Sequence, residues 1–336
     1  MTRTGGGDPD AFFGAFGRVA RLGGRRGEKT TLVGFACFPR EQRVEEFVIT
    51  NLDTGVTRLA ASPRGDAVYA ATKERTIVEV QLGTTLSNLR GAGRVEVDTR
   101  VVAGLDATAY ALGVAPKSGH LVFGGADKTL WVSDPSRKRS PPRWLVTRES
   151  WIYDVCFSPG GERAFFCSGD GVLRSVSLPD ARGIRGSRDV SVHGRADSLI
   201  LTAATTPGGK NVVFSGGDAS VRLVPASPGE KGSGAVLGNA EGQVEALDVP
   251  PAGGYAFVGG VDRKLRRFSL VEREVGPGEV LATYPGTIRE VATSPTGRCV
   301  AFVGKGGTPF VLDLRTGEVL EGVRGGGDAF GLVLVS

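Results

Sequence analysis

The sequence is poor in the residues that build most catalytic and metal centres. It has only 2 histidines and 4 cysteines among 336 residues. The cysteines all stand in apolar, strand-like runs and none forms a C-x-x-C pair, so we predict reduced thiols in the core. His120 and His193 do not stand at metal-ligand spacing. We therefore expect no metal and no cofactor.

Long apolar runs and catalytic motifs are also missing from the sequence. No stretch approaches the roughly 18 consecutive apolar residues of a membrane helix, and the chain does not open on a secretory signal. There is no G-x-S-x-G elbow, no H-E-x-x-H and no P-loop. These absences argue against an enzyme, a small-molecule substrate and membrane insertion. We expect an intracellular protein, cytoplasmic or nuclear.

What the chain has instead is glycine and a repeat. Its 52 glycines are spread along the whole length, which indicates many tight turns. One module recurs: an apolar strand, a turn with proline and glycine, a second strand, a Gly/Asp turn and a third strand. Two copies of the second and third strands are AVYAATKERTIVEVQL, from Ala67, and VVFSGGDASVRLVPA, from Val212.

The spacing of the module predicts the fold. The turn prolines of the six copies are Pro63, Pro116, Pro159, Pro207, Pro250 and Pro295. They stand 53, 43, 48, 43 and 45 residues apart. A period of about 40 to 45 residues with several short strands per unit is typical of propeller blades. The expected fold is therefore an all-β propeller.

The repeat resembles that of the WD-repeat family. Three turns of the Ser-Pro-x-Gly kind are present, at Ser62–Gly65, Ser158–Gly161 and Ser294–Gly297. Turn aspartates follow the second strands at Asp127, Asp170, Asp218 and Asp262. The Trp-Asp ending survives only as Trp131-Val132-Ser133-Asp134 and Leu312-Asp313, and the nearest echo of Gly-His is His193-Gly194. The resemblance covers about residues 30 to 336 and implies a seven-bladed propeller.

The two ends of the chain supply the strands of a seventh blade. The stretch Ala329–Ser336 matches a first strand, since Ser336 lies 42 residues after Ser294. Its expected partners are Thr31–Phe38 and Glu46–Asn51, in a blade of three strands. Pairing of the C-terminal strand with these N-terminal strands would close the ring and remove an open edge. We thus expect a propeller over residues 30–336, preceded by an extension over residues 1–29.

That extension carries both apolar and basic residues. Asp10–Leu22 is predicted to form a short helix capped by Asp10, with Phe12, Phe13 and Phe16 mostly on one side. Three interpretations compete: the segment packs on the propeller, docks into a partner, or targets the chain to an organelle. Two aspartates argue against targeting, because transit peptides are poor in acidic residues. We favour partner docking.

Two further groups of residues are candidates for binding. The loops between the third and fourth strands of blades two and three carry cations, at Arg137, Lys138, Arg139, Arg143, Arg182, Arg185 and Arg188. Such clusters suit phosphate contacts or an acidic partner, and they are also typical of a solvated loop. The second group stands at the starts of the blades, namely Tyr110, Trp151, Tyr153 and Arg289. In WD-repeat proteins these positions open onto the narrower face, where peptides dock.

The sequence therefore predicts a non-enzymatic scaffold for protein–protein interactions, a subunit of a larger complex. Trp, Tyr and Arg are the residues that most often anchor interfaces, which fits the second group. The alternative is an RNA-contacting propeller of a ribonucleoprotein that uses the basic loops of blades two and three. The net charge of +5 permits either partner.

Overall fold

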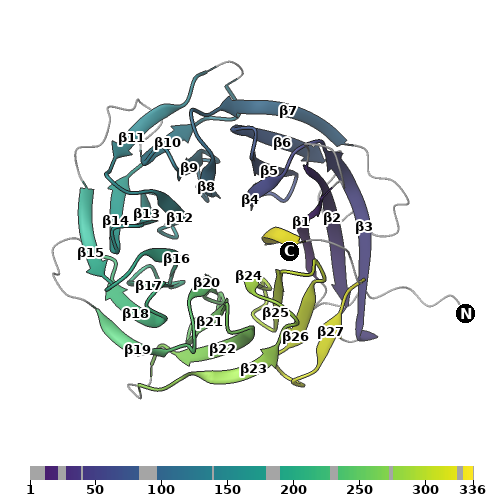
Figure 1. Cartoon of the computed structure of the whole chain (residues 1–336), viewed down its shortest axis with the longest axis vertical. Coiled ribbons are helices and arrows are strands. Elements are labelled where there is room, and N and C mark those ends of the chain that lie inside the picture. Colours follow the sequence, from purple (N-terminus) through teal and green to yellow (C-terminus); the bar gives the residue numbers. More distant parts are fainter. Residues whose placement is uncertain are drawn as a thin grey trace, which may run out of the picture.

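The computed structural model describes residues 12–21, 28–38, 41–82, 97–137, 140–178, 190–227, 234–271, 275–323 and 328–335. These residues form seven four-stranded antiparallel sheets arranged as blades around a central axis (Figure 1). The predicted all-β, seven-bladed propeller is confirmed. No helix among these residues is long and apolar enough to cross a membrane.

Blades one to six each use four consecutive strands, running outward from the axis. Blade one holds β4 (Val56–Ala61), β5 (Ala67–Thr72), β6 (Thr76–Leu82) and β7 (Val97–Gly104). Blade two holds β8 (Ala109–Val114), β9 (Leu121–Gly125), β10 (Thr129–Ser133) and β11 (Arg143–Thr147). Blade three holds β12 (Ile152–Phe157), β13 (Arg163–Ser168), β14 (Val172–Ser177) and β15 (Val190–Arg195).

The next three blades repeat this order. Blade four holds β16 (Ile200–Thr205), β17 (Asn211–Gly216), β18 (Ser220–Pro225) and β19 (Ala235–Asn239). Blade five holds β20 (Val244–Asp248), β21 (Tyr255–Gly260), β22 (Lys264–Ser269) and β23 (Glu279–Thr283). Blade six holds β24 (Ile288–Thr293), β25 (Cys299–Gly304), β26 (Phe310–Asp313) and β27 (Val319–Glu321).

The seventh blade joins the two ends of the chain. Its order is β28 (Asp328–Val335), β1 (Phe12–Arg21), β2 (Glu28–Phe38) and β3 (Arg43–Leu52). The expected closure by the C-terminal strand is confirmed, but its direct partner is β1 and not β2. The blade has four strands where three were expected.

The helix predicted over Asp10–Leu22 is wrong, because Phe12–Arg21 is a β-strand. Its backbone pairs with β2 on one side and with β28 on the other, Phe16 lying opposite both Val33 and Leu332. Helix propensity in this segment is weak, since it holds Gly14 and Gly17. As a strand, the segment forms backbone hydrogen bonds and side-chain contacts with a neighbouring strand on each side, and these stabilise it more than an isolated helix would.

The turns between first and second strands follow the expected Ser-Pro-x-Gly chemistry. The hydroxyl of Ser62 accepts a hydrogen bond from the Ala67 N–H at 3.1 Å, and Gly65 takes a φ of 70°. Ser158 and Ser294 accept the corresponding bonds from Arg163 and Cys299. We call the side of the ring with these turns the proline face.

The opposite side, the aspartate face, holds the turns between second and third strands. The carboxylate of each turn aspartate accepts the backbone N–H two residues on, as at Asp170 and Val172. It also accepts a bond from the side chain four residues on. The four pairs are Asp127–Trp131, Asp170–Arg174, Asp218–Arg222 and Asp262–Arg266. These aspartates are structural, as their local backbone chemistry predicts.

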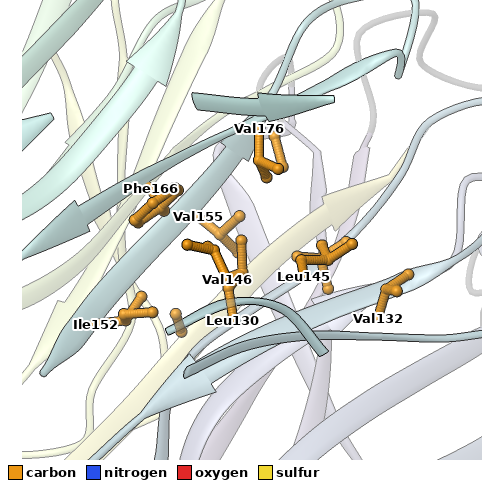
Figure 2. Packing of buried hydrophobic residues seen from close by; sticks show 11 residues of the cluster. Leu130, Val132, Leu145, Val146, Ile152, Val155, Phe166 and Val176 are labelled. Carbon is orange, nitrogen blue, oxygen red and sulfur yellow. The ribbon is translucent and has the colours of Figure 1, made fainter. Parts of the chain in front are cut away.

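Apolar side chains fill the space between neighbouring blades. Figure 2 shows one such cluster, in which Leu130, Val132, Leu145 and Val146 of blade two meet blade three. The opposing side chains include Ile152, Val155 and Phe166. Equivalent clusters follow around the ring, and the last joins blades six and seven through Phe35, Cys299 and Leu332. Because each blade buries both of its faces, loss of one blade exposes two others.

Deletion of Ala329–Ser336 should therefore prevent the propeller from closing. Without β28, blade seven loses its inner strand and the edge of β1 is left unpaired. We expect an insoluble protein, or one that binds a hydrophobic dye and lacks near-UV circular dichroism. A truncated chain that stays soluble and melts cooperatively would contradict this closure.

A single substitution probes the contact between β28 and blade one. Gly331 has a φ of 66°, and a Cβ there would lie 2.6 Å from the backbone nitrogen of Leu59 in blade one. We expect Gly331→Ala to lower the free energy of unfolding by about 3 kcal/mol, from backbone strain plus the clash. Gly317→Ala is the matched control, because Gly317 has a φ of 75° and open space around it. It should cost only about 1 kcal/mol, and urea unfolding measures both.

Candidate functional site

The inner strands place the predicted interface residues. In blades one to six each inner strand is bulged at its second residue, so that this residue has no direct partner in the next strand. Bulges re-aim side chains and are common beside functional sites. Tyr110, Tyr153 and Arg289 occupy the bulged position of blades two, three and six. The bulge lies at the end of the strand next to the aspartate face.

Three of the four predicted residues form one aromatic cluster. The ring centroids of Tyr110 and Trp151 are 5.8 Å apart, those of Tyr110 and Tyr153 are 6.0 Å apart, and those of Trp151 and Tyr153 are 6.4 Å apart. The two tyrosine rings are stacked, with 24° between their planes. The Trp151 side chain leaves 46% of its surface exposed. Partial burial, with Tyr110 alongside, raises the pKa of the Tyr153 phenol, which keeps it neutral.

Arg289 does not join this cluster. Its strand, β24, lies across the ring from β8 and β12 (Figure 1). Its charged neighbour is Glu245, at the bulged position of blade five. Burial raises the pKa of the Glu245 carboxyl, and the positive charge of Arg289 opposes that shift. The predicted set therefore divides into an aromatic cluster over blades two and three and a polar pair over blades five and six.

One residue further along the inner strands, an ionic cluster spans the channel, and the sequence did not predict it. The guanidinium of Arg58 in blade one donates to Asp154 of blade three at 2.7 Å and to Glu290 of blade six at 2.6 Å. In the intervening blade two, the equivalent position holds Ala111, whose small side chain leaves room for this reach. The three side chains expose 19% of Arg58, 8% of Asp154 and 14% of Glu290.

The ionic cluster extends to further blades through the backbone. The second carboxylate oxygen of Asp154 accepts the N–H of Ala203 in blade four at 3.0 Å. Glu290 accepts a backbone hydrogen bond from Gly331 in blade seven. One guanidinium thus serves two buried carboxylates, and the group connects five of the seven blades. Burial raises the pKa of Glu290 to about 7, because Arg58 only partly offsets the desolvation and the charge of Asp154.

In blade two, β10 ends and β11 begins at the proline face, away from the aromatic cluster. Arg137 is exposed and its Nε lies 3.1 Å from the Asp134 carboxylate. Arg143 is exposed at the first position of β11. The other predicted cations, Lys138, Arg139, Arg182, Arg185 and Arg188, fall outside the described residues. Phe12, Phe13 and Phe16 belong to β1, within the closing blade.

His193, the residue nearest to a Gly-His pair, is buried and hydrogen-bonded. His193 is 2% exposed. Its Nδ1 lies 3.1 Å from the carbonyl oxygen of Pro225 in the next blade, and its Nε2 lies 2.8 Å from the hydroxyl of Ser175. The Pro225 carbonyl can only accept, so Nδ1 carries the proton and Nε2 accepts from Ser175. Burial lowers the pKa of His193, which keeps the ring neutral.

The described residues contain no group of three or more His, Cys, Asp or Glu side chains that could hold a metal ion. None of the four cysteines is in a disulfide. Burial raises the pKa of both the Cys156 and the Cys167 thiol, which makes them poor nucleophiles.

Comparisons with known proteins add no family. No protein-family model matches the chain, and no curated protein matches it. The seven-bladed architecture therefore stands on the structure, and likeness to WD repeats remains a resemblance of turns and spacing.

The ionic cluster predicts an unusual dependence of stability on pH. Glu290 binds its proton more tightly in the folded chain than the ordinary pKa of 4.5 allows, so folding takes up a proton between about pH 4.5 and 7. The free energy of unfolding should then fall as the pH rises through this window, by up to about 3 kcal/mol.

Glu290→Gln should remove the part of this slope that Glu290 contributes and leave the part that Glu245 contributes, as measured by urea unfolding from pH 5 to pH 8. Glu162→Gln is the control, because a backbone hydrogen bond and the charge of Lys117 lower the pKa of that exposed carboxyl out of the window. If Glu290→Gln kept the full slope, the ionic cluster would not be its source.

Proposed function

We propose that the protein is a non-enzymatic scaffold that docks a partner protein on its aspartate face, as a subunit of a larger complex. A β-propeller is commonly a protein-interaction scaffold, although a fold by itself does not determine function. The observation that carries the proposal is the aromatic cluster. Trp and Tyr at the centre of a patch are the usual anchors of protein interfaces.

The geometry of the cluster supports docking rather than ordinary packing. Trp151 stands outside the inter-blade core and contacts Tyr110 and Tyr153 by its ring. Its backbone carbonyl accepts the N–H of Gly169 at 3.0 Å, which ties the residue to the adjacent turn. A rigid, half-exposed set of rings loses little side-chain entropy on binding. Blades two and three thus offer a preformed anchor site.

RNA binding by the proline face is the second candidate. Arg143 is exposed at the end of the basic loop, with no carboxylate partner among the described residues. Phosphate contacts would make such binding steeply dependent on salt, whereas an aromatic anchor would not. The two candidates use opposite faces, so one set of variants separates them.

Affinity capture of the tagged chain from its own cell extract tests both candidates. Trp151→Ala with Tyr153→Ala should lose the captured partners, with the melting temperature little changed. The control is Tyr255→Ala, since Tyr255 is also an exposed aromatic but lies against Arg267 in blade five. Partners that survive nuclease treatment and vanish in the double variant support the scaffold. Partners that vanish with nuclease and survive in the double variant would support the RNA-binding candidate instead.

A further inference from the structure

The outer strands share a pattern that one blade breaks. In six blades the outer strand has one bulged residue, whose side chain packs into the core between blades. The residue before it turns its side chain away from that core. The outward residues are Val48, Val101, Trp144, Val192, Val236 and Val280. Five blades use valine and only blade two uses tryptophan. The fold therefore does not require an aromatic ring at this position.

Blade two is also unusual in the strand beneath. In blades three to five the outward valine lies opposite an arginine of the third strand, which is bound to the turn aspartate. In blade two Trp144 lies opposite Trp131, whose Nε1 donates to Asp127 at 2.6 Å. Trp131 thus takes over the structural bond, while the Trp144 side chain leaves 57% of its surface exposed.

These two tryptophans line a groove on the outer rim. The groove has a volume of about 700 Å³, within the range of ligand sites, and its walls include Trp131, Trp144, Val146, Arg148 and Val190. Leu145 and Val146 also pack into the core between blades two and three (Figure 2). The floor of the groove is therefore held by the inter-blade core, and only its outer wall is free to meet a partner.

Arg148 lies at one end of the groove and forms no ion pair with the described residues. The Nε of Arg148 is buried and has no hydrogen-bond partner. Asp170 is nearby, but it is held by two bonds from Arg174, at 2.6 and 3.0 Å. Burial and the charge of Arg174 lower the pKa of Arg148. A carboxylate brought to this end would relieve an unpaired, half-buried charge.

The other end of the strand carries a second cation. Arg143 opens β11 and is exposed, and no acidic residue stands between it and Arg148. An extended chain rises about 3.3 Å per residue, so the five steps from Arg143 to Arg148 span about 16 Å. Arg143 is not among the residues that line the groove, so the groove presents an apolar surface with one cation, Arg148, at its end.

We propose that this rim groove binds a short acidic peptide segment of a partner protein. An apolar side chain of the segment lies against Trp131 and Trp144, and a carboxylate pairs with Arg148. This surface is separate from the aromatic cluster and does not depend on its function.

Fluorescence anisotropy on the full chain tests the proposal. The probe is a dye-labelled peptide of about nine residues, with Asp and Glu at both ends and Leu-Phe-Leu in the middle. We expect micromolar binding that Trp144→Val weakens by about tenfold or more, since it restores the residue of the other blades and leaves the fold intact. Arg148→Gln should weaken binding by a similar factor. Val280→Ala, at the same place in blade five, should leave it unchanged.

Peptide charge and competition decide the outcome. A peptide of the same apolar core with Lys in place of Asp and Glu should not bind. The proposal is overturned if both peptides bind alike, or if the Trp144→Val variant binds the acidic peptide as well as the parent does. It is also overturned if single-stranded RNA displaces the acidic peptide and Trp144→Val does not weaken that binding. Circular dichroism melting confirms that each variant is folded.

Discussion

The structure depends on one pairing, that of the C-terminal strand β28 with β1. Six blades are built from consecutive strands, but the seventh exists only when strands from both ends of the chain meet. Every blade buries two faces against its neighbours, so an open ring would expose apolar surface on both sides of the gap. Closure also leaves no inner edge for another chain to pair with. This pairing therefore holds the two faces and the rim in fixed positions.

The ionic cluster makes the same ring interdependent at its centre. Arg58, Asp154 and Glu290 come from blades one, three and six, and they meet only if all the blades between them are in place. Removing one partner of a buried ion pair costs far more than the pair contributes. The ionic cluster therefore forms only in the correctly assembled ring. The two binding surfaces that we propose, on the aspartate face and on the rim, lie on different sides of that ring.

Much of this could be predicted from the sequence, because the repeat carries it. Prolines at regular spacing predicted the blades, and the positions six to eight residues before them predicted Tyr110, Trp151, Tyr153 and Arg289 at the blade starts. That the first three cluster and Arg289 does not appears only in the structure. Phe12–Arg21 could not be assigned from its own residues, since its partner strands lie far away in the chain and pairing overrides a weak local preference. Arg58 and Trp144 were missed for another reason. The ion pairs of Arg58 and the exposed position of Trp144 stand out only when equivalent positions of all blades are compared.

The central claim, that the ring is closed by β1 between β28 and β2, is tested most directly by native-state hydrogen exchange. If the account is right, the amides of Phe12–Arg21 are protected and exchange only when the whole propeller unfolds, with the same free energy as the amides of β5 and β13. If these amides exchange at the rate of a free tail while β5 and β13 stay protected, β1 is not part of the closing blade.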